Sequence, residues 1–420
     1  MTLWVLQLAR ALFLTGVFAW SAGIVYVSYD SLLLVFVFAM TLDLAGRRAI
    51  PARLTVPADT VGVIIAAYNE AAVLPFTLQA LRSQSAPPEL VVIADDGSTD
   101  DTAELLTTRY GLIQPADGAL SPPSATQPGL RWLRVPHGGK ARALNAALLV
   151  TDTTLILTVD ADTRLEPDAV AAMRHAFAAN PALVAATGVL APVCGSDIDG
   201  RVLQWFQTYE YIRDFLSRHA WARLDSLQLI SGAFAGFRRA PVLSVGGFDT
   251  DCLVENYELI HRLRRHSVQH QLGWTTSVLG SALGRTSAPG TVSAFVCQRR
   301  HWFGGFLQTQ YWYRDMCGNG PYSWLGRLML PVKAIDTMQP VYGLTALALL
   351  AYYIVTGRFA VAFPVAGVIG AQIVLDFPFH LWSVHLYRRW VGGRTNVRLL
   401  PAFIASVLEP LARLGCAIPP

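Results

Sequence analysis

The sequence predicts an α/β domain with a Rossmann-like, mostly parallel sheet, set between α-helical transmembrane and interfacial segments. Three observations predict this class. Only 15% of the 420 residues are charged, well below the roughly 25% of a typical soluble domain. The apolar residues gather at the two ends of the chain. Between the ends, short apolar runs alternate with segments of helical period.

The N-terminal end predicts a transmembrane hairpin within residues 1–46. Apolar runs at 3–27 and 31–45 are separated by a polar trio at 28–30, where the chain is expected to turn. The first run is long enough to cross a bilayer, and the second is expected to be the return arm. Arginines at 47–53 then place the end of the hairpin in the cytoplasm, because positive residues favour that side.

The C-terminal end, residues 337–420, predicts about three further spans. Its apolar runs lie at 338–355, 359–381 and 399–414. Arginines between 388 and 398 form a second cytoplasmic flank. Both ends therefore predict a multi-pass protein of the cell (inner or plasma) membrane, with its middle domain in the cytoplasm and its C-terminus outside.

The middle of the chain, residues 47–290, predicts alternating strands and helices. A continuous apolar run at 61–67 indicates a strand buried on both faces, and leucines at helical spacing indicate a helix over 70–83. The alternation continues with strands at 90–94, 132–135 and 155–159, helices at 99–109 and 140–150, and a loop at 111–129. Residues 291–336 mix tryptophan and arginine with apolar residues, which favours interfacial helices.

Polar residues follow three of these strands, at the sheet edge where ligands of open α/β sheets bind. Any single carboxylate there could be only a helix cap. Asp160 and Asp162, however, are two residues apart in a turn and suit Mg²⁺ or Mn²⁺ together with phosphate oxygens. Lys140, one of only two lysines in the chain, could reach a phosphate or a sugar hydroxyl.

Composition also excludes some functions. The net charge of +4 is too small for a nucleic-acid footprint. The five cysteines show no CxxC pair and no histidine spacing for zinc, so we interpret them as small apolar residues.

At this point the chain resembles the family 2 glycosyltransferases, specifically the membrane-integrated synthases of cellulose, hyaluronan and poly-N-acetylglucosamine. The resemblance rests on the order and spacing of several motifs over residues 61–308. In chain order these motifs are Ala66-Ala67-Tyr68-Asn69-Glu70, Asp95-Asp96-Gly97-Ser98-Thr99-Asp100, Gly139-Lys140-Ala141-Arg142-Ala143-Leu144-Asn145, Asp160-Ala161-Asp162, Ser231-Gly232-Ala233-Phe234, Gly246-Gly247-Phe248-Asp249 and Gln298-Arg299-Arg300-His301-Trp302.

The resemblance implies a GT-A fold, a UDP-sugar donor, and Mg²⁺ or Mn²⁺ on Asp160 and Asp162. Asp95 and Asp96 match the family's uracil and ribose site, and Ala66 replaces a proline of the family pattern. The residues implied in binding the donor and its sugar are Ala66, Tyr68, Glu70, Asp95, Asp96, Lys140, Asn145, Asp160, Gln298, Arg299, Arg300, His301 and Trp302. Trp302 would stack on an acceptor sugar, although interfacial packing is an alternative.

Two departures from the family pattern concern the chemistry. The family's T-E-D motif carries the presumed general base, and here Asn256 takes the place of its aspartate, next to Glu255. An amide cannot accept the acceptor's proton, so either Glu255 is the base, or Glu258 or Asp249 replaces it, or the chemistry is impaired. The family's Q-x-x-R-W arginine is replaced by His301, with Arg299 and Arg300 adjacent.

The function implied by the resemblance is an inverting, metal-dependent hexosyltransferase. It would move a sugar from a UDP-sugar to a growing polysaccharide, processively and with coupled export. Two alternatives remain open: a non-processive enzyme with a lipid acceptor, and a catalytically impaired membrane scaffold. The implied partners are the UDP-sugar, a polysaccharide or lipid acceptor and membrane lipids, with no nucleic acid.

Overall fold

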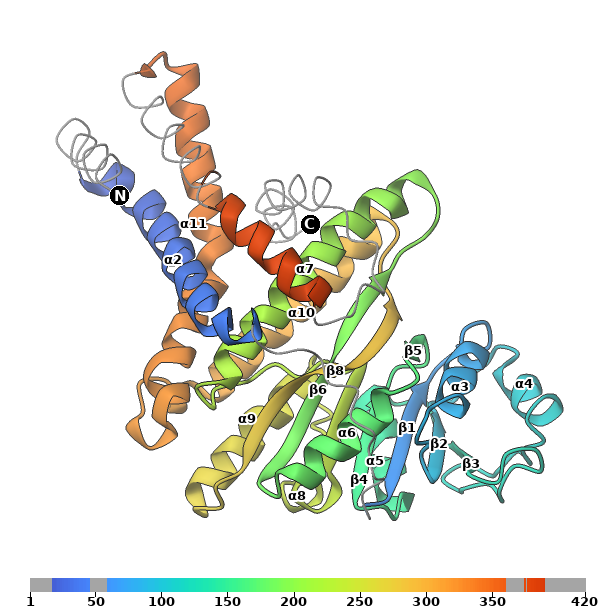
Figure 1. Cartoon of the computed structure of the whole chain (residues 1–420). Coiled ribbons are helices and arrows are strands. Elements are labelled where there is room, and N and C mark those ends of the chain that lie inside the picture. Colours follow the sequence, from blue (N-terminus) through green and yellow to red (C-terminus); the bar gives the residue numbers. More distant parts are fainter. Residues whose placement is uncertain (1–16, 46–58, 360–373, 375, 390–420) are drawn as a thin grey trace.

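An eight-stranded sheet forms the centre of the domain in the computed structural model, which describes residues 17–45, 59–359, 374 and 376–389 (Figure 1). The strand order is β3-β2-β1-β4-β7-β6-β8-β5. The strand bounds are β1 Val61–Ala67, β2 Leu90–Asp95, β3 Leu130–Arg134, β4 Leu155–Val159, β5 Thr163–Leu165, β6 Leu183–Val193, β7 Phe234–Arg238 and β8 Thr275–Ser287.

The half of the sheet for which the sequence predicted the strands is parallel, as expected. β3, β2, β1 and β4 are parallel neighbours, and β1 and β4 have the predicted bounds. The other half is mixed: β6 and β8 pair in parallel, whereas β7 runs antiparallel to both β4 and β6, and β5 antiparallel to β8. Only β7 and β5 are therefore reversed in the eight-stranded sheet, which is mostly parallel as predicted. Because β7 is reversed, the residues just before it lie at the carboxyl end of β4, where the backbone N–H of Asp160 donates to Ala233 O at 3.2 Å.

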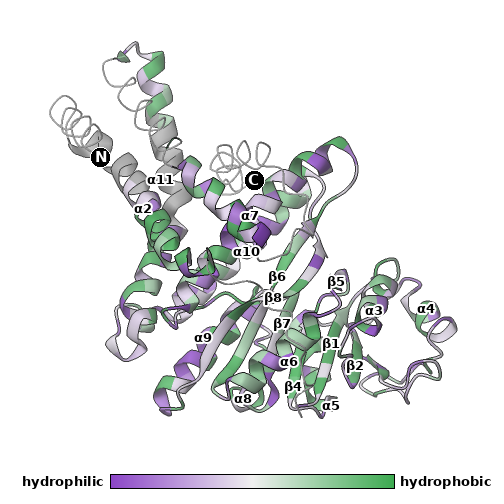
Figure 2. Ribbon diagram, viewed as in Figure 1, coloured by the Kyte–Doolittle hydropathy of each residue, from purple (hydrophilic) through white to green (hydrophobic). Residues whose placement is uncertain are grey.

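Helices cover both faces of the sheet. Side chains of α3, α4 and α6 pack on one face and those of α5, α7, α8 and α9 on the other. The strands are mainly hydrophobic, as this double burial requires, whereas the last turns of α9 are hydrophilic (Figure 2). The helix bounds are α2 Val17–Thr41, α3 Leu74–Arg82, α4 Thr102–Thr108, α5 Lys140–Val150, α6 Ala169–Ala179, α7 Ile198–Ala222, α8 Arg239–Ser244, α9 Glu255–Gln269, α10 Val292–Trp312 and α11 Leu330–Val355, with short turns η1 Leu42–Ala45, η2 Arg314–Met316, η3 Gly320–Tyr322 and η4 Leu325–Met329.

The expected turn at 28–30 is absent, because α2 runs without interruption through it. The polar side chains there are used in contacts between helices instead. Tyr29 donates to Asp336 on α11 at 3.0 Å, and Asp30 lies 4.0 Å from Arg213 on α7. The predicted hairpin is thus corrected to a single helix over its described part, since these contacts satisfy the polar groups without a turn.

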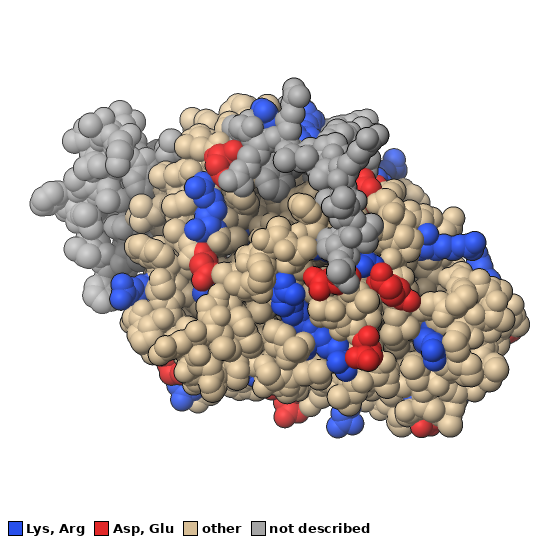
Figure 3. All heavy atoms as spheres, turned by 60° about the horizontal axis from the view of Figure 1, so that its bottom comes forward, with Lys and Arg blue, Asp and Glu red and all other residues tan. Residues whose placement is uncertain are grey.

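Within the described segments, no helix meets the length and apolarity needed to cross a membrane. The predicted span at 399–414 and most of the one at 359–381 fall outside those segments. The described residues 376–389 are helical, and Phe379, Val384 and Tyr387 join the core on the α7 face of the sheet. On the face shown in Figure 3, acidic and basic side chains are interspersed.

Candidate active site

A cavity of about 590 Å³ lies at the carboxyl end of β4, between the sheet and helices α2, α7, α10 and α11. Its sheet end brings together Lys140, Asp160, Asp162, Glu255 and Asn256, which the sequence predicted from three separate motifs. They meet because the motifs follow β4 or open α5 and α9 at one edge of the sheet. The far end of the cavity is lined by α7, α10 and α11.

Lys140, the first residue of α5, is the cation of this group. Its Nζ lies 2.6 Å from Asp160 Oδ1 and 3.6 Å from Glu255 Oε1. Burial opposes its charged form, but the carboxylates of Asp160 and Glu255 outweigh burial and raise the pKa of Lys140 above its ordinary value. Lys140 therefore remains a cation and links the predicted metal ligand to the candidate base.

Three carboxylates, of Glu70, Asp160 and Asp162, act on one another electrostatically. Burial first, and then the charge of Asp160, raise the pKa of Asp162. Burial, followed by Asp162 and Asp160, raises the pKa of Glu70. Among the described residues, no three His, Cys, Asp or Glu side chains form a complete metal site. The Asp160–Asp162 pair nevertheless fits Mg²⁺ or Mn²⁺, because such ions use one or two protein carboxylates with phosphate and water oxygens, and a cation would relieve this repulsion.

Glu255 and Asn256 form the first turn of α9 and both line the cavity. The Asn256 amide donates from Nδ2 to Glu255 Oε1 at 2.7 Å. Gly232 makes this approach possible, because a Cβ there would lie 2.6 Å from Asn256 Nδ2 and 3.4 Å from Lys140 Nζ. The glycine of the Ser-Gly-Ala-Phe segment is thus required by close packing against the site.

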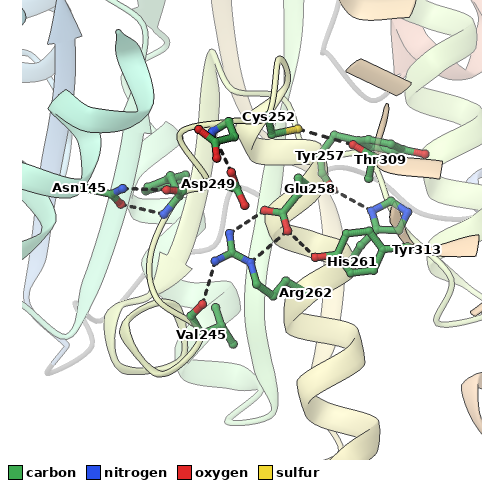
Figure 4. Close-up of polar contacts among 12 residues, drawn as sticks. Asn145, Val245, Asp249, Cys252, Tyr257, Glu258, His261, Arg262, Thr309 and Tyr313 are labelled. Atoms are coloured by element: carbon green, nitrogen blue, oxygen red, sulfur yellow. Dashed lines mark hydrogen bonds and ion pairs between the residues drawn. The ribbon is translucent and has the colours of Figure 1, made fainter. Parts of the chain in front are cut away.

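Glu258 and Asp249 are not placed to act as the base. Glu258 is 1% exposed and accepts from Arg262 Nε at 3.0 Å, from an Arg262 terminal nitrogen at 2.6 Å and from the Tyr313 hydroxyl (Figure 4). Asp249 Oδ1 accepts from the backbone N–H of Asp251 at 2.8 Å. Neither residue lines the cavity, whereas Glu255 does.

Asp95 and Asp96, predicted to contact the nucleoside, are buried and already hydrogen-bonded. Asp95 accepts from the Ser98 backbone at 2.8 Å and from the Trp132 indole at 3.2 Å. Asp96 accepts from the backbone N–H groups of Gly138 and Gly139 at 2.8 and 2.9 Å. Both carboxylates therefore shape the loops ahead of α5.

The surface beside these loops is aromatic. His137 Nδ1 lies 2.9 Å from an Asp96 carboxylate oxygen. The His137 ring stacks on Tyr68, with centroids 4.3 Å apart, and the Tyr68 side chain is 44% exposed. This exposed ring pair offers a flat surface on which a nucleobase could stack.

Three other predicted donor residues lie outside the cavity lining. Asn145 bonds through both amide atoms to the backbone of Phe248, at 2.7 Å each, and so anchors the Gly246–Asp249 loop to α5. Ala66 is part of β1, paired with Ala94 of β2. Arg300 is exposed on α10. Asn145 and Ala66 thus make contacts within the fold and Arg300 faces solvent, and their role in donor binding stays a prediction.

The other residues of the Gln298–Trp302 motif do line the cavity, on α10. Arg299 is held by an ion pair with Glu210 of α7, and its guanidinium lies 4.4 Å from the ring centroids of both Phe295 and Trp302. Gln298 accepts from Arg299 at 2.6 Å. His301 occupies the place of the family's arginine but is exposed. The guanidinium nearest the site is thus already paired.

Sequence reasoning missed the contribution of α7. Glu210, which pairs with Arg299, lines the cavity together with Arg213, Asp214 and Arg218 of the same helix. Their positions at i, i+3, i+4 and i+8 place them along one side of a helix, which is the only signal the sequence carried. Lys333, the second lysine of the chain, also lines this cavity and pairs with Asp336 at 2.5 Å.

Comparisons with known proteins agree with this geometry. The profile of Glycosyl transferase family 2 matches residues 62–246, and that of Glycosyl transferase family group 2 matches residues 155–374, more than half of the chain. A poly-beta-1,6-N-acetyl-D-glucosamine synthase of Staphylococcus epidermidis (strain RP62A) is 27% identical over 249 residues, covering 59% of this chain and 54% of that protein. The synthase of Staphylococcus aureus (strain COL) is 27% identical over 243 residues, covering 58% and 53%. The chain spans about half the length of these curated relatives.

Among solved structures, mannosyltransferase PcManGT from Pyrobaculum calidifontis, in complex with GDP-Man and Mn²⁺, has the same fold. The TM-score is 0.60 at 19% identity, over 93% of this chain and 97% of that one. The fold, the converging motifs and the family profiles lead to one conclusion: the chain belongs to Glycosyl transferase family group 2 and is a family 2 glycosyltransferase.

Proposed function

We propose that this enzyme moves a sugar from a UDP-sugar to a growing polysaccharide, with inversion at the anomeric carbon. The observation that carries the proposal is the single cavity that joins the Lys140, Asp160 and Glu255 cluster to a wall of paired charges and aromatic rings on α7 and α10. Aromatic faces and charge-assisted hydrogen-bonding groups are what a carbohydrate chain can contact along its length. The names of the curated relatives, which are polysaccharide synthases, agree with this acceptor.

In the proposed reaction, a hydroxyl oxygen of the acceptor attacks the anomeric carbon of the donor sugar. The bond between that carbon and the diphosphate breaks, and its electron pair leaves with the diphosphate. Glu255 receives the hydroxyl proton, because it is the carboxylate of α9 that faces the cavity. Lys140, held between Glu255 and Asp160, supplies positive charge at the place where the diphosphate acquires negative charge.

A divalent cation belongs to this proposal, held by Asp160 and Asp162. When bound, Mg²⁺ or Mn²⁺ would supply charge stabilisation to the leaving diphosphate. The donor's nucleobase would stack on the exposed Tyr68–His137 ring pair. Lys140 contacts Asp160 directly, whereas Arg299 is paired with Glu210 of α7, so Lys140 is the protein cation placed beside the leaving group.

The apolar ends of the sequence support a membrane location with a cytoplasmic catalytic domain and an exported product. A second candidate function is favoured by one observation. Apolar side chains of α2, including Leu33, Leu34 and Val37, line the same cavity and could face a lipid acceptor. The size of the product separates the two, because a lipid acceptor would receive single sugars and a processive synthase would yield long chains.

The test uses membranes that contain the full chain and a panel of radiolabelled nucleotide sugars with Mg²⁺ or Mn²⁺. We expect one UDP-sugar to be incorporated into a polymer, and the Glu255→Gln variant to lose transfer by about 10²- to 10⁴-fold while it still binds the donor. Asp249→Asn is the matched control, since this nearby carboxylate does not line the cavity, and should transfer normally. Full turnover by Glu255→Gln would exclude Glu255 as the base.

A further inference from the structure

Asn256 contains an unpartnered polar atom at the centre of the site. The residue is 5% exposed and lines the cavity. Its amide nitrogen donates to Glu255 at 2.7 Å, but its buried carbonyl oxygen, Oδ1, has no hydrogen-bond partner. Buried polar atoms are nearly always paired, so an isolated acceptor that lines a ligand cavity calls for an explanation.

The orientation of this amide is determined by its neighbour. An ionised carboxylate only accepts hydrogen bonds, so Asn256 must present its NH₂ group to Glu255 and turn Oδ1 away from it. Lys140 Nζ is directed at Asp160, 2.6 Å away, and at Glu255, 3.6 Å away. Gly232, on the other side, has no side chain that could donate, and there is no room for one. These neighbours leave Oδ1 unpaired, and Asn256 lines the cavity, so the partner is sought among ligands bound there.

The attacking hydroxyl is not that partner. It has one proton, and in the proposed reaction this proton goes to Glu255. Oδ1 needs a different O–H or N–H donor, and on a saccharide such donors lie next to the attacking hydroxyl on the same ring. The two adjacent side chains would then contact two neighbouring groups of one sugar.

We propose that Asn256 is a specificity-determining residue for the acceptor, whose Oδ1 accepts a hydrogen bond from a second O–H or N–H group of the acceptor's terminal sugar. This inference rests on the proposed function. Asn256 neither gains nor loses a proton in the reaction: its NH₂ group orients Glu255 and its carbonyl selects the acceptor. A site that hydrogen-bonds a substrate group rejects an analogue without that group, because its own buried atom is then left unpaired.

The experiment measures discrimination as well as rate. Wild type and Asn256→Ala are assayed with UDP-N-acetylglucosamine and a β-1,6-linked N-acetylglucosamine trisaccharide. They are also assayed with analogues of that trisaccharide that each lack one donor group of the terminal sugar other than the attacking hydroxyl. These probes follow the product named for the curated relatives; if the panel above identifies another sugar, the acceptor series is built from that sugar. Affinity for UDP serves as the check of folding.

We expect wild type to use one analogue at least about tenfold less efficiently than the parent trisaccharide, and Asn256→Ala to use both equally. Asn256→Asp retains an acceptor oxygen at the same place and should retain the discrimination, which also covers the case in which the alanine variant fails to fold. Unchanged discrimination in Asn256→Ala, with normal UDP affinity, would overturn the inference. A wild type that transfers no sugar from any donor overturns the proposed function instead, and this outcome is visible before any variant is made.

Discussion

Replacing Glu258 with alanine should destabilise the enzyme without removing its base. Glu258 is 1% exposed, and its carboxylate accepts two hydrogen bonds from Arg262 and one from Tyr313 (Figure 4). Burial, together with the Glu258 carboxylate, raises the pKa of Tyr313, so its hydroxyl remains a donor. The substitution leaves the Arg262 guanidinium and the Tyr313 hydroxyl without this partner.

The loss of stability depends on the contacts that Arg262 and Tyr313 keep after the substitution. Breaking a buried ion pair by removing one partner costs about 3–5 kcal/mol. Arg262 keeps a hydrogen bond to Val245 O at 2.8 Å, and its side chain is 23% exposed, so water can compensate it in part. We therefore expect the lower limit, about 3 kcal/mol, which at about 2–4 °C per kcal/mol lowers the Tm by roughly 6–12 °C.

The assay is thermal unfolding of the purified full chain in detergent, with Glu166→Ala as the matched control. Glu166 pairs with Arg285 at 3.0 Å, but their side chains are 24% and 48% exposed, so this pair should be worth about 1 kcal/mol or less. Glu258→Gln, which keeps an acceptor for Tyr313, should transfer sugar normally. Equal Tm values for Glu258→Ala and the control would refute the structural role, and loss of transfer in a folded Glu258→Gln would restore Glu258 as a candidate base.

Three further predictions test other parts of the site. Asp162→Asn should raise the Mn²⁺ concentration for half-maximal transfer about tenfold or more, and an unchanged metal titration would remove Asp162 from the metal site. Gly232→Ala should lower kcat for transfer at least about tenfold and leave the affinity for UDP unchanged, because the added Cβ would lie 2.6 Å from Asn256 Nδ2. The control is Gly304→Ala, since the atom nearest to its added Cβ is the flexible Leu253 Cδ1 at 3.3 Å. Burial lowers the pKa of His261 from 6.5 to about 4, so the unfolded chain takes up this proton at a higher pH than the folded chain does. The free energy of unfolding should therefore fall by up to about 3 kcal/mol as the pH drops from 6.5 to about 4. In denaturant titrations His261→Phe should flatten this pH dependence, and an equally steep fall in the variant would assign the dependence to other groups.

Much of the parallel half of the sheet could be predicted from sequence because β1 and β4 at its centre are continuous apolar runs. β1 and β4 are buried along almost their whole length, and α5 begins and ends where predicted. The mixed half could not be predicted. β8 alternates buried and half-buried residues and contains serine, threonine and glycine, and β7 is only five residues long. Neither pattern indicates the direction of its strand, so the sequence did not show that β7 runs antiparallel to β4 and β6.

The candidate site shows the same division. Motif spacing brought together Lys140, Asp160 and Glu255, because all three lie at the ends of regular elements at one sheet edge. Spacing could not show that Asp96 bonds to the loop before α5, or that Arg299 is paired with Glu210. Both are contacts between segments distant in sequence. A motif does not show whether a residue contacts the ligand itself or holds in place a loop that contacts the ligand.

The two departures from the family pattern are best understood as one change in charge. The family's aspartate would place a negative charge at position 256, and its arginine a positive charge at position 301. Here both positions line the same cavity, as a neutral amide and a histidine. Loss of the negative charge alone would leave the cavity more positive by one charge, and loss of the positive charge alone would leave it more negative by one. With both changed, the remaining groups still pair: Lys140 with Asp160 and Glu255, and Arg299 with Glu210. Glu255 is the carboxylate of α9 that lines the cavity, which is why the base is expected one residue earlier than in the family.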